Sequence, residues 1–226
     1  MRLAAVRDIL EAADYLRACG AISLLNAVRC RFLLHYRRLL VLELAFEEFV
    51  PPPNQARRYL PSLHIGRVSH GHVTEIMDLL RRHRVWRRRR ELEEVLQQRS
   101  AVLFAADQGQ IIAYACASSS IPSTHKFARG VTLDSRCAYG VHAFVATRYR
   151  SMGVYPRLVA ELVRDLHRQE YVRMRIVCDP RNRVALSSHR RVGMKVVQEL
   201  RVLNIAGLVR TRLCAIGPHP PDETAR

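Results

Sequence analysis

A short loop of arginine, serine and glycine residues just before a helix has the residue types of an anion-binding site. The loop runs from Arg150 to Tyr155, between an apolar run and a helical segment that begins at Pro156. A helix N-terminus carries unpaired N–H groups and partial positive charge, which favour a phosphate. Ser151, the nearest good N-capping residue, lies several positions before the helix, and Gly153 permits close backbone approach. The stretch Val145 to Glu161 therefore predicts a site for a phosphate-bearing ligand.

A second segment with spaced polar residues lies later in the chain. It runs from Asn182 through His189 to Gly193-Met194, and it follows an apolar run that ends at Asp179-Pro180. Gly193 is a good C-terminal stop for a helix. The pattern predicts a strand, a turn and a helix, so both segments have the same order of elements.

Apolar periodicity predicts the elements that position these two segments. Strands are expected at Leu39 to Phe46, Ser62 to Val68, Ala101 to Ala106, Gln110 to Ala117, Ala138 to Ala146, Met174 to Cys178, Lys195 to Ile205 and Leu208 to Leu213. Helices are expected at Leu3 to about Leu34, Ser69 to Leu80, Arg87 to Arg99, Pro156 to about Gln169 and Val184 to Val192. Ile121 to Asp134 is expected to be a polar loop.

The three prolines Pro51-Pro52-Pro53 form a stiff break and the best domain boundary. We divide the chain into an N-terminal helical extension with a strand (1–50), a mixed α/β domain (54–215) and a disordered tail (216–226). The N-terminal helix is expected to pack on the domain or on a second subunit, as in a homodimer. A basic amphipathic helix in peripheral contact with a membrane surface is the alternative.

Composition limits the remaining function classes. The formal charge of +17 over 226 residues favours anionic partners such as nucleotide cofactors or acidic proteins. The densest basic run, Arg81 to Arg90, lacks an accompanying nucleic-acid motif, which disfavours nucleic acid. The six cysteines form no C-x-x-C pair, so neither disulfides nor a metal site is predicted. There is no signal-peptide layout and no transmembrane segment, which predicts a cytoplasmic protein.

Together the two segments resemble the motifs of the GNAT superfamily of acyl-CoA-dependent N-acyltransferases. The family's acyl-CoA loop usually reads V-x-P-x-x-R-G-x-G-x-G/A, and this chain has Val145-Ala-Thr-Arg-Tyr-Arg-Ser-Met-Gly-Val-Tyr155 in that register. The family's N-x-x-A/S-x-x-x-Y-x-x-x-G-F motif corresponds to Asn182 through Met194. The resemblance covers roughly Leu60 to Leu213. It implies an α+β fold with a central, mostly antiparallel sheet whose central strands splay apart, flanked by helices.

The resemblance also implies which residues bind acyl-CoA. Phe144 and Val145 correspond to the splayed strand beside the acyl-pantetheine arm, and Asn182 to a residue beside the pantetheine. The loop that wraps the pyrophosphate, mainly through main-chain N–H groups, corresponds to Arg150, Ser151, Met152, Gly153, Val154 and Tyr155. Ser151 and Tyr155 stand where the family has glycine or alanine, but both still supply N–H groups.

Candidate catalytic residues follow from the same register. The family's frequent tyrosine general acid is His189 here, and a histidine of unperturbed pKa ~6.5 is partly protonated at neutral pH. A packing or hydrogen-bonding role on the helix is the other interpretation of His189. His142, on the predicted central strand, is the candidate general base, directly or through water. Tyr139 is a further residue expected to face the cleft, and a structural role for His142 stays open.

The sequence therefore predicts an N-acyltransferase that transfers an acetyl group from acetyl-CoA to a primary amine by direct attack. One alternative is a longer acyl donor, carried on CoA or on an acyl carrier protein. The other is a non-catalytic module that binds acyl-CoA. The acceptor is not specified, although Glu91, Glu93 and Glu94 are acidic residues that could line its entrance.

Overall fold

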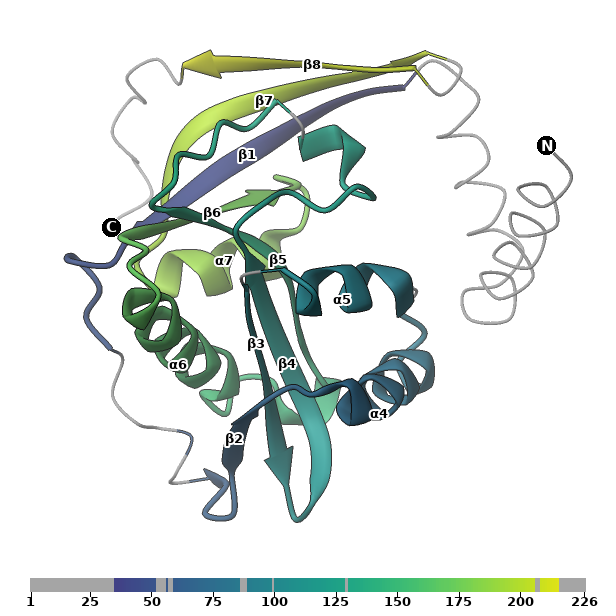
Figure 1. Ribbon diagram of the computed structural model, residues 1–226, viewed down its shortest axis with the longest axis vertical. Coiled ribbons are helices and arrows are strands. Elements are labelled where there is room, and N and C mark those ends of the chain that lie inside the picture. Colours follow the sequence, from purple (N-terminus) through teal and green to yellow (C-terminus); the bar gives the residue numbers. More distant parts are fainter. Residues whose placement is uncertain are drawn as a thin grey trace, which may run out of the picture.

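The computed structural model describes residues 35–51, 56, 59–85, 89–98, 100–128, 130–205 and 208–215 (Figure 1). The predicted N-terminal helix, Leu3 to about Leu34, lies outside the described residues, as does the predicted tail 216–226. Within the described part of the chain, no helix has both the length and the apolar character needed to span a bilayer.

One 8-stranded sheet organises the molecule, with strand order β2-β3-β4-β5-β6-β1-β7-β8. The strands are β1 (His35–Ala45), β2 (His64–Arg67), β3 (Ser100–Asp107), β4 (Gln110–Ser118), β5 (Cys137–Val145), β6 (Arg173–Cys178), β7 (Lys195–Ile205) and β8 (Leu208–Ala215). Adjacent strands are antiparallel, except that β5 and β6 are parallel. The predicted α+β fold with a mostly antiparallel sheet is confirmed.

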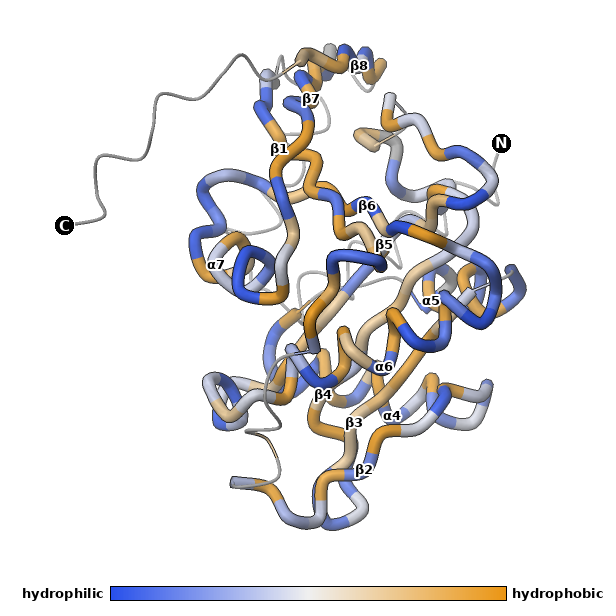
Figure 2. Tube along the Cα trace, turned by 90° about the vertical axis from the view of Figure 1, so that its left-hand side faces the viewer, coloured by the Kyte–Doolittle hydropathy of each residue, from blue (hydrophilic) through white to orange (hydrophobic). Residues whose placement is uncertain are grey.

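Helices cover both faces of the sheet. Helices α6 (Val154–Arg168) and α7 (Arg183–Arg191) lie on one face, and α4 (His70–Arg82) and α5 (Arg89–Leu96) lie on the other (Figure 1). Because both of their faces are covered, β3 and β4 are apolar almost throughout rather than alternating. Figure 2 shows this concentration of hydrophobic residues along the two strands. Two hydrophobic cores result, one on each side of the sheet.

The parallel strands β5 and β6 pair only over a short stretch and then separate. Their register joins Cys137 to Arg173 and ends at Tyr139 opposite Arg175, although both strands continue beyond this point. A Cβ on Gly140 would lie 2.3 Å from Cγ2 of Ile176, so that side chain occupies the space where a larger residue would stand. The splay that the family resemblance implied therefore begins at Gly140.

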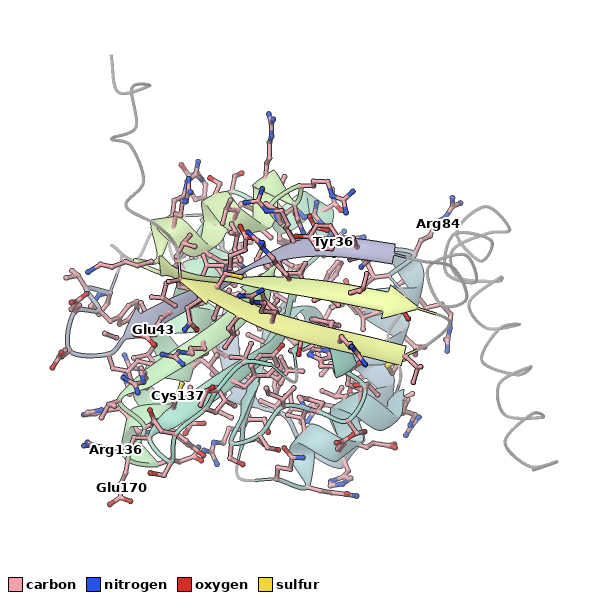
Figure 3. All side chains as sticks on the ribbon, turned by 90° about the horizontal axis from the view of Figure 1, so that it is seen from above. Tyr36, Glu43, Arg84, Arg136, Cys137 and Glu170 are labelled. Carbon is pink, nitrogen blue, oxygen red and sulfur yellow. The ribbon has the colours of Figure 1, made fainter. Side chains whose placement is uncertain are left out.

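Strand β1 lies inside the sheet, between β6 and β7, although it precedes the proline break in the chain. Glu43 lies on β1 (Figure 3). Its carboxylate accepts a hydrogen bond from Nε of Arg175 on β6 at 2.7 Å, which joins the two strands. Leu42 and Leu44 of β1 are buried in the core that α6 covers. Residues on both sides of the prolines thus share one sheet and one core.

The four predicted helices that fall within the described residues occur with small shifts at their ends. Ser69 is the N-cap of α4, as predicted, and shares a capping box with His72. Helix α6 begins at Val154, before Pro156, because Gly153 provides the left-handed residue that starts it. The predicted loop between Ile121 and Asp134 contains one turn of 3-10 helix, η1 (Lys126–Ala128).

Candidate active site

The loop between β5 and α6 has the backbone geometry of an anion cradle. A turn of 3-10 helix, η2 (Thr147–Tyr149), is followed by Ser151 with φ +64° and Gly153 with φ +78°. A left-handed backbone costs a residue with a Cβ roughly 1–2 kcal/mol, which explains why the family prefers glycine where Ser151 stands. Nε of Arg150 donates to the carbonyl of Val145 at 3.2 Å, which ties the loop to the end of β5.

The N-terminus of α6 lies directly after this loop. Its N-cap is Gly153, which has no side chain that could accept hydrogen bonds from the first helical N–H groups. Those donors and the helix dipole together favour an anion at this position. The structure thus brings the predicted residues Arg150 to Tyr155 together at one helix end, beside the splayed strands.

His189 lies against Tyr155, a pairing that the sequence did not predict. The Tyr155 hydroxyl and Nδ1 of His189 are 2.6 Å apart, and the rings meet edge to face. Burial lowers the pKa of His189 to about 4, so the imidazole is neutral at neutral pH. Burial, followed by the nearby Cys178, raises the pKa of Tyr155, which therefore keeps its proton. The prediction that His189 is partly protonated at neutral pH used an ordinary histidine pKa, and burial lowers the pKa below that value.

Asn182 lies at the N-terminus of α7, close after the end of β6. Its Oδ1 accepts a hydrogen bond from the backbone N–H of Ala185 at 3.2 Å, so the side chain caps the helix. Its backbone N–H donates to the carbonyl of Asp179 at 2.9 Å. Contact with a pantetheine arm stays a prediction for this residue.

On the opposite face of the sheet, a buried cluster of ionisable residues surrounds His142. Oε1 of Glu91, from α5, lies 2.5 Å from Nε2 of His125 and 3.0 Å from Nε2 of His142. One carboxylate oxygen therefore faces two imidazole nitrogens. Burial alone would raise the pKa of Glu91, but the two histidines outweigh it and hold that pKa well below its usual range. Glu91 is therefore a carboxylate.

A β-bulge turns His142 toward this cluster. Gly140 pairs with Ala117 and His142 with Cys116, so Val141 is the extra residue in β5. Tyr139 and His142, three positions apart, can then face the same side of the sheet. The hydroxyl of Tyr139 lies 3.2 Å from Nδ1 of His125. Both strand residues that the sequence singled out therefore meet in one cluster.

The sequence did not identify Glu91 and His125 as members of this site. Glu91 was named only as an acidic residue that could line the acceptor entrance, and it is buried in the first turn of α5. His125 lies in a loop that offered no motif. Glu93 and Glu94 instead line an open polar hollow with Gln97 and Ser123. The sequence signals for this cluster were Tyr139 and His142, an aromatic residue and a histidine on the strand that precedes the predicted donor loop.

The donor atoms of Glu91, His125 and His142 lie within 4.8 Å of one another, and their types suit a metal such as zinc. Ligands bound to one tetrahedral zinc ion at ~2.0–2.1 Å stand about 3.3 Å apart. The two contacts to Oε1 are shorter than this, at 2.5 and 3.0 Å. These distances fit a carboxylate shared between imidazole N–H groups better than a metal site.

Comparison with known proteins identifies the family of this chain. The profile of the acetyltransferase (GNAT) family matches residues 73–194. An aminoglycoside N-acetyltransferase solved in complex with CoA is 21% identical, with a TM-score of 0.47, over 58% of this chain and 91% of that one. A Drosophila protein is 13% identical, with a TM-score of 0.55, over 82% of this chain and 56% of that one. No match is found among curated proteins.

A third structure contains a GCN5-related glucosamine N-acetyltransferase region within a fungal multi-domain β-N-acetylglucosaminidase. It is 15% identical, with a TM-score of 0.54, over 80% of this chain and 22% of that one. The family profile extends from α4 to the residue after Gly193, so it spans the donor loop and the α7 motif and covers more than half of the chain. The chain belongs to the GNAT family of acetyltransferases.

Proposed function

We propose that the protein transfers an acetyl group from acetyl-CoA to a primary amine by direct attack. One observation supports this most strongly: the splay between β5 and β6 lies beside the uncapped N-terminus of α6. The splay offers unpaired backbone groups to an acyl-pantetheine arm, and the helix end offers N–H donors to a pyrophosphate. A ligand that carries both parts matches the two features together.

The donor would lie along the far end of β5. Beyond Tyr139, β5 keeps its pairing with β4 but not with β6, so one edge of Phe144 and Val145 faces the splay. A backbone N–H on this edge can polarise the thioester carbonyl and stabilise the oxyanion that forms during attack. The residues Arg150 to Tyr155 would hold the pyrophosphate, mainly by backbone N–H groups.

The reaction needs one base and one acid. The amine nitrogen attacks the carbonyl carbon, the carbon–sulfur bond breaks, the nitrogen loses a proton and the thiolate gains one. An amine of pKa ~10.4 costs roughly 4–5 kcal/mol to deprotonate at pH 7, whereas a thiol of pKa ~8.5 needs about 2 kcal/mol of help. The base therefore has the more demanding task. His142, at the splayed end of β5, is its candidate.

The acid is assigned to the pair formed by Tyr155 and His189. His189 is neutral at neutral pH, so the proton-bearing group next to it is the Tyr155 hydroxyl. We propose that this hydroxyl donates to the leaving thiolate while His189 positions it. Because α7 and the donor loop both contribute to the pair, it stands at the meeting point of the two motif segments.

The test is a titration of the full chain with acetyl-CoA, followed calorimetrically. Gly153→Glu should abolish binding, because the new carboxylate would lie where the pyrophosphate is expected. Gly109→Glu is the matched control: Gly109 has φ +77°, against +78° for Gly153, but it lies in a hairpin turn with nothing within 4 Å. Both substitutions therefore place a side chain on a left-handed backbone of nearly equal φ. Equal affinities for the two variants, or no binding by the unmodified protein, would reject the proposal.

Activity is then measured with a panel of amines that includes amino sugars, amino acids and peptide N-termini. Release of CoA thiol and acetylated product in equal amounts is the expected result. Acetyl-CoA is compared with longer acyl-CoA donors and an acyl carrier protein in the same assay. Donor binding without turnover across the panel would favour the non-catalytic alternative.

A further inference from the structure

The outer end of the sheet, where β1, β7 and β8 lie side by side, has two different faces. On one face, Leu39 of β1 lies opposite Leu200 of β7, which lies opposite Leu213 of β8, and the first two of these are buried. The residues next to them in each strand point to the other face, because side chains alternate along a strand. Figure 1 shows β8 at one end of the molecule, away from the described helices α4 to α7.

A row of arginines crosses this other face. Arg38 of β1 lies opposite Arg201 of β7, and Arg201 lies opposite Arg212 of β8. Arg210 lies two residues before Arg212 and therefore shares its face. The side chains of Arg38 and Arg201 are 63% and 50% exposed, and both arginines of β8 are exposed as well. Because like charges directly opposite each other destabilise a sheet, strand pairing does not explain the row.

One carboxylate balances part of this charge. Oε2 of Glu199 accepts a hydrogen bond from Nε of Arg38 at 3.0 Å, and Oε1 accepts one from Nε of Arg201 at 2.8 Å. The hydrogen bond from Arg38, followed by that from Arg201, holds the pKa of Glu199 below its usual range, so it stays a carboxylate. Within the described part of the chain, neither Arg210 nor Arg212 forms an ion pair with an acidic side chain. Four arginines against one carboxylate leave the face strongly positive.

Two exposed apolar residues lie on the same face, beside the arginines. Tyr36 lies two residues before Arg38 in β1, opposite Leu203, and is 54% exposed. Leu208 lies two residues before Arg210 in β8 and is 76% exposed. Figure 3 looks onto this end of the molecule, with Tyr36 labelled on β1. Basic residues with exposed apolar side chains beside them are the two features that attach proteins to anionic bilayers.

We propose that this face of β1, β7 and β8 is a docking surface for a bilayer that contains anionic lipids. Strands lie ~4.7–4.9 Å apart and their side chains stand roughly perpendicular to the sheet, so Arg38, Arg201 and Arg212 reach one plane. A guanidinium matches the geometry of a lipid phosphate or carboxylate, and Tyr36 belongs to a residue type enriched at the headgroup level. The chain enters β1 from residues 1–34, whose basic sequence with periodic apolar residues offers the second contact that stable attachment needs.

Two other occupants fit this face less well. In a homodimer that pairs two β8 edges, Arg210 and Arg212 of the two copies would face each other, and like charges across a strand pair repel. Single-stranded nucleic acid binds where several aromatic side chains stack its bases, whereas Tyr36 is the one aromatic residue that the described strands place on this face. A lipid surface needs no stacking platform and meets all four arginines at once.

The test is co-sedimentation of the full chain with phosphatidylcholine vesicles, with and without phosphatidylserine, at physiological ionic strength. Binding is expected only when phosphatidylserine is present, and it should weaken as salt is added. An arginine near an anionic surface contributes about fivefold to partitioning. Arg210→Ala combined with Arg212→Ala should therefore weaken binding about twenty- to thirtyfold and make it less sensitive to salt. Tyr36→Ala should weaken binding without changing the salt dependence.

Arg81→Ala combined with Arg82→Ala is the matched control, because it removes the same charge from another exposed site. These residues end α4, which packs on β4, three strands away from β1. Charges beyond a Debye length of ~8 Å are largely screened, so this variant should change vesicle binding by no more than about twofold. Thermal unfolding should be the same in all variants, because the substituted arginines are exposed.

Three results would overturn the proposal. The first is that phosphatidylserine makes no difference, whether both kinds of vesicle bind the protein or neither does. The second is an equal loss of binding in the two double variants, which indicates attraction by overall charge alone. The third is a single-stranded oligonucleotide or an acidic carrier protein whose binding is lost in the β8 variant while vesicle binding is kept, which assigns the face to that partner.

Discussion

Gly140 and Ile176 face each other where the two parallel strands of the sheet separate. A Cβ on Gly140 would lie 2.3 Å from Cγ2 of Ile176, and pairing between β5 and β6 ends one residue earlier, at Tyr139. The Ile176 side chain packs into the space that glycine leaves. This contact sets where the strands begin to splay, and it leads to the first prediction.

Gly140→Ala should destabilise the fold by roughly 1–3 kcal/mol, the usual cost of overpacking a core, and should weaken acetyl-CoA binding. The control is Gly71→Ala in the first turn of α4, where the nearest atom is 3.7 Å from the added Cβ. Alanine there should be neutral or stabilising by about 0.5–1 kcal/mol. Urea unfolding and calorimetric titration measure both effects. Equal stabilities for the two variants would contradict this account of the splay.

Ser151→Gly should stabilise the protein, because Ser151 has φ +64°. Relief of left-handed strain is worth roughly 1–2 kcal/mol, and the added chain entropy of glycine offsets about 0.5–1 kcal/mol of it. Donor binding should be retained, since the backbone N–H is unchanged. Ser187→Gly, in α7, is the control and should lose stability by about half a kcal/mol. A loss of stability in Ser151→Gly would mean that the serine side chain makes a needed contact.

His189 should make the fold sensitive to acid. Its pKa is about 4 in the folded protein and ~6.5 when unfolded, so the unfolded chain binds more protons between these values. Stability should therefore fall as pH decreases from about 6.5 through about 4, and it should be unaffected by this group above that range. In His189→Phe this part of the pH dependence should disappear, as seen in unfolding free energies measured across the range.

The turnover rate tests the proposed roles of Tyr155 and His189 in the reaction. Tyr155→Phe removes the hydroxyl that the reaction is proposed to use, so it should lower kcat about a hundredfold with little change in donor affinity. His189→Phe should also lower kcat, because the hydroxyl loses the partner 2.6 Å away that positions it. Unchanged kcat in Tyr155→Phe would assign the acid role elsewhere.

The ion pair between Arg67 and Asp165 should be important for joining β2 to α6. The Arg67 guanidinium donates to both oxygens of the buried Asp165 carboxylate, through Nε at 3.1 Å and Nη2 at 2.5 Å. Arg67→Ala leaves that carboxylate without its guanidinium and should cost about 1–3 kcal/mol. Arg81→Ala, which breaks an exposed pair with Asp78, should cost well under 1 kcal/mol. Thermal unfolding of the two variants distinguishes these cases.

The sequence by itself determined the local elements and the donor loop. Apolar runs such as Ala101 to Ala106 are properties of neighbouring residues, and local patterns report them directly. The motif around Arg150 to Tyr155 is contiguous, so its position before a helix could be predicted. Gly193 likewise marks the C-terminal end of α7 by residue type alone.

Only the tertiary structure decided which distant residues meet. Glu91 and His142 come together because α5 packs on the sheet and a bulge at Val141 reorients β5, and neither event leaves a local pattern. The pKa of His189 is lowered by its burial beside Tyr155. That burial arises only in the folded chain, so it could not be predicted from the ordinary pKa of a histidine. Local propensity fixes where helices and strands lie, whereas proton affinities depend on charges and burial contributed by the whole fold.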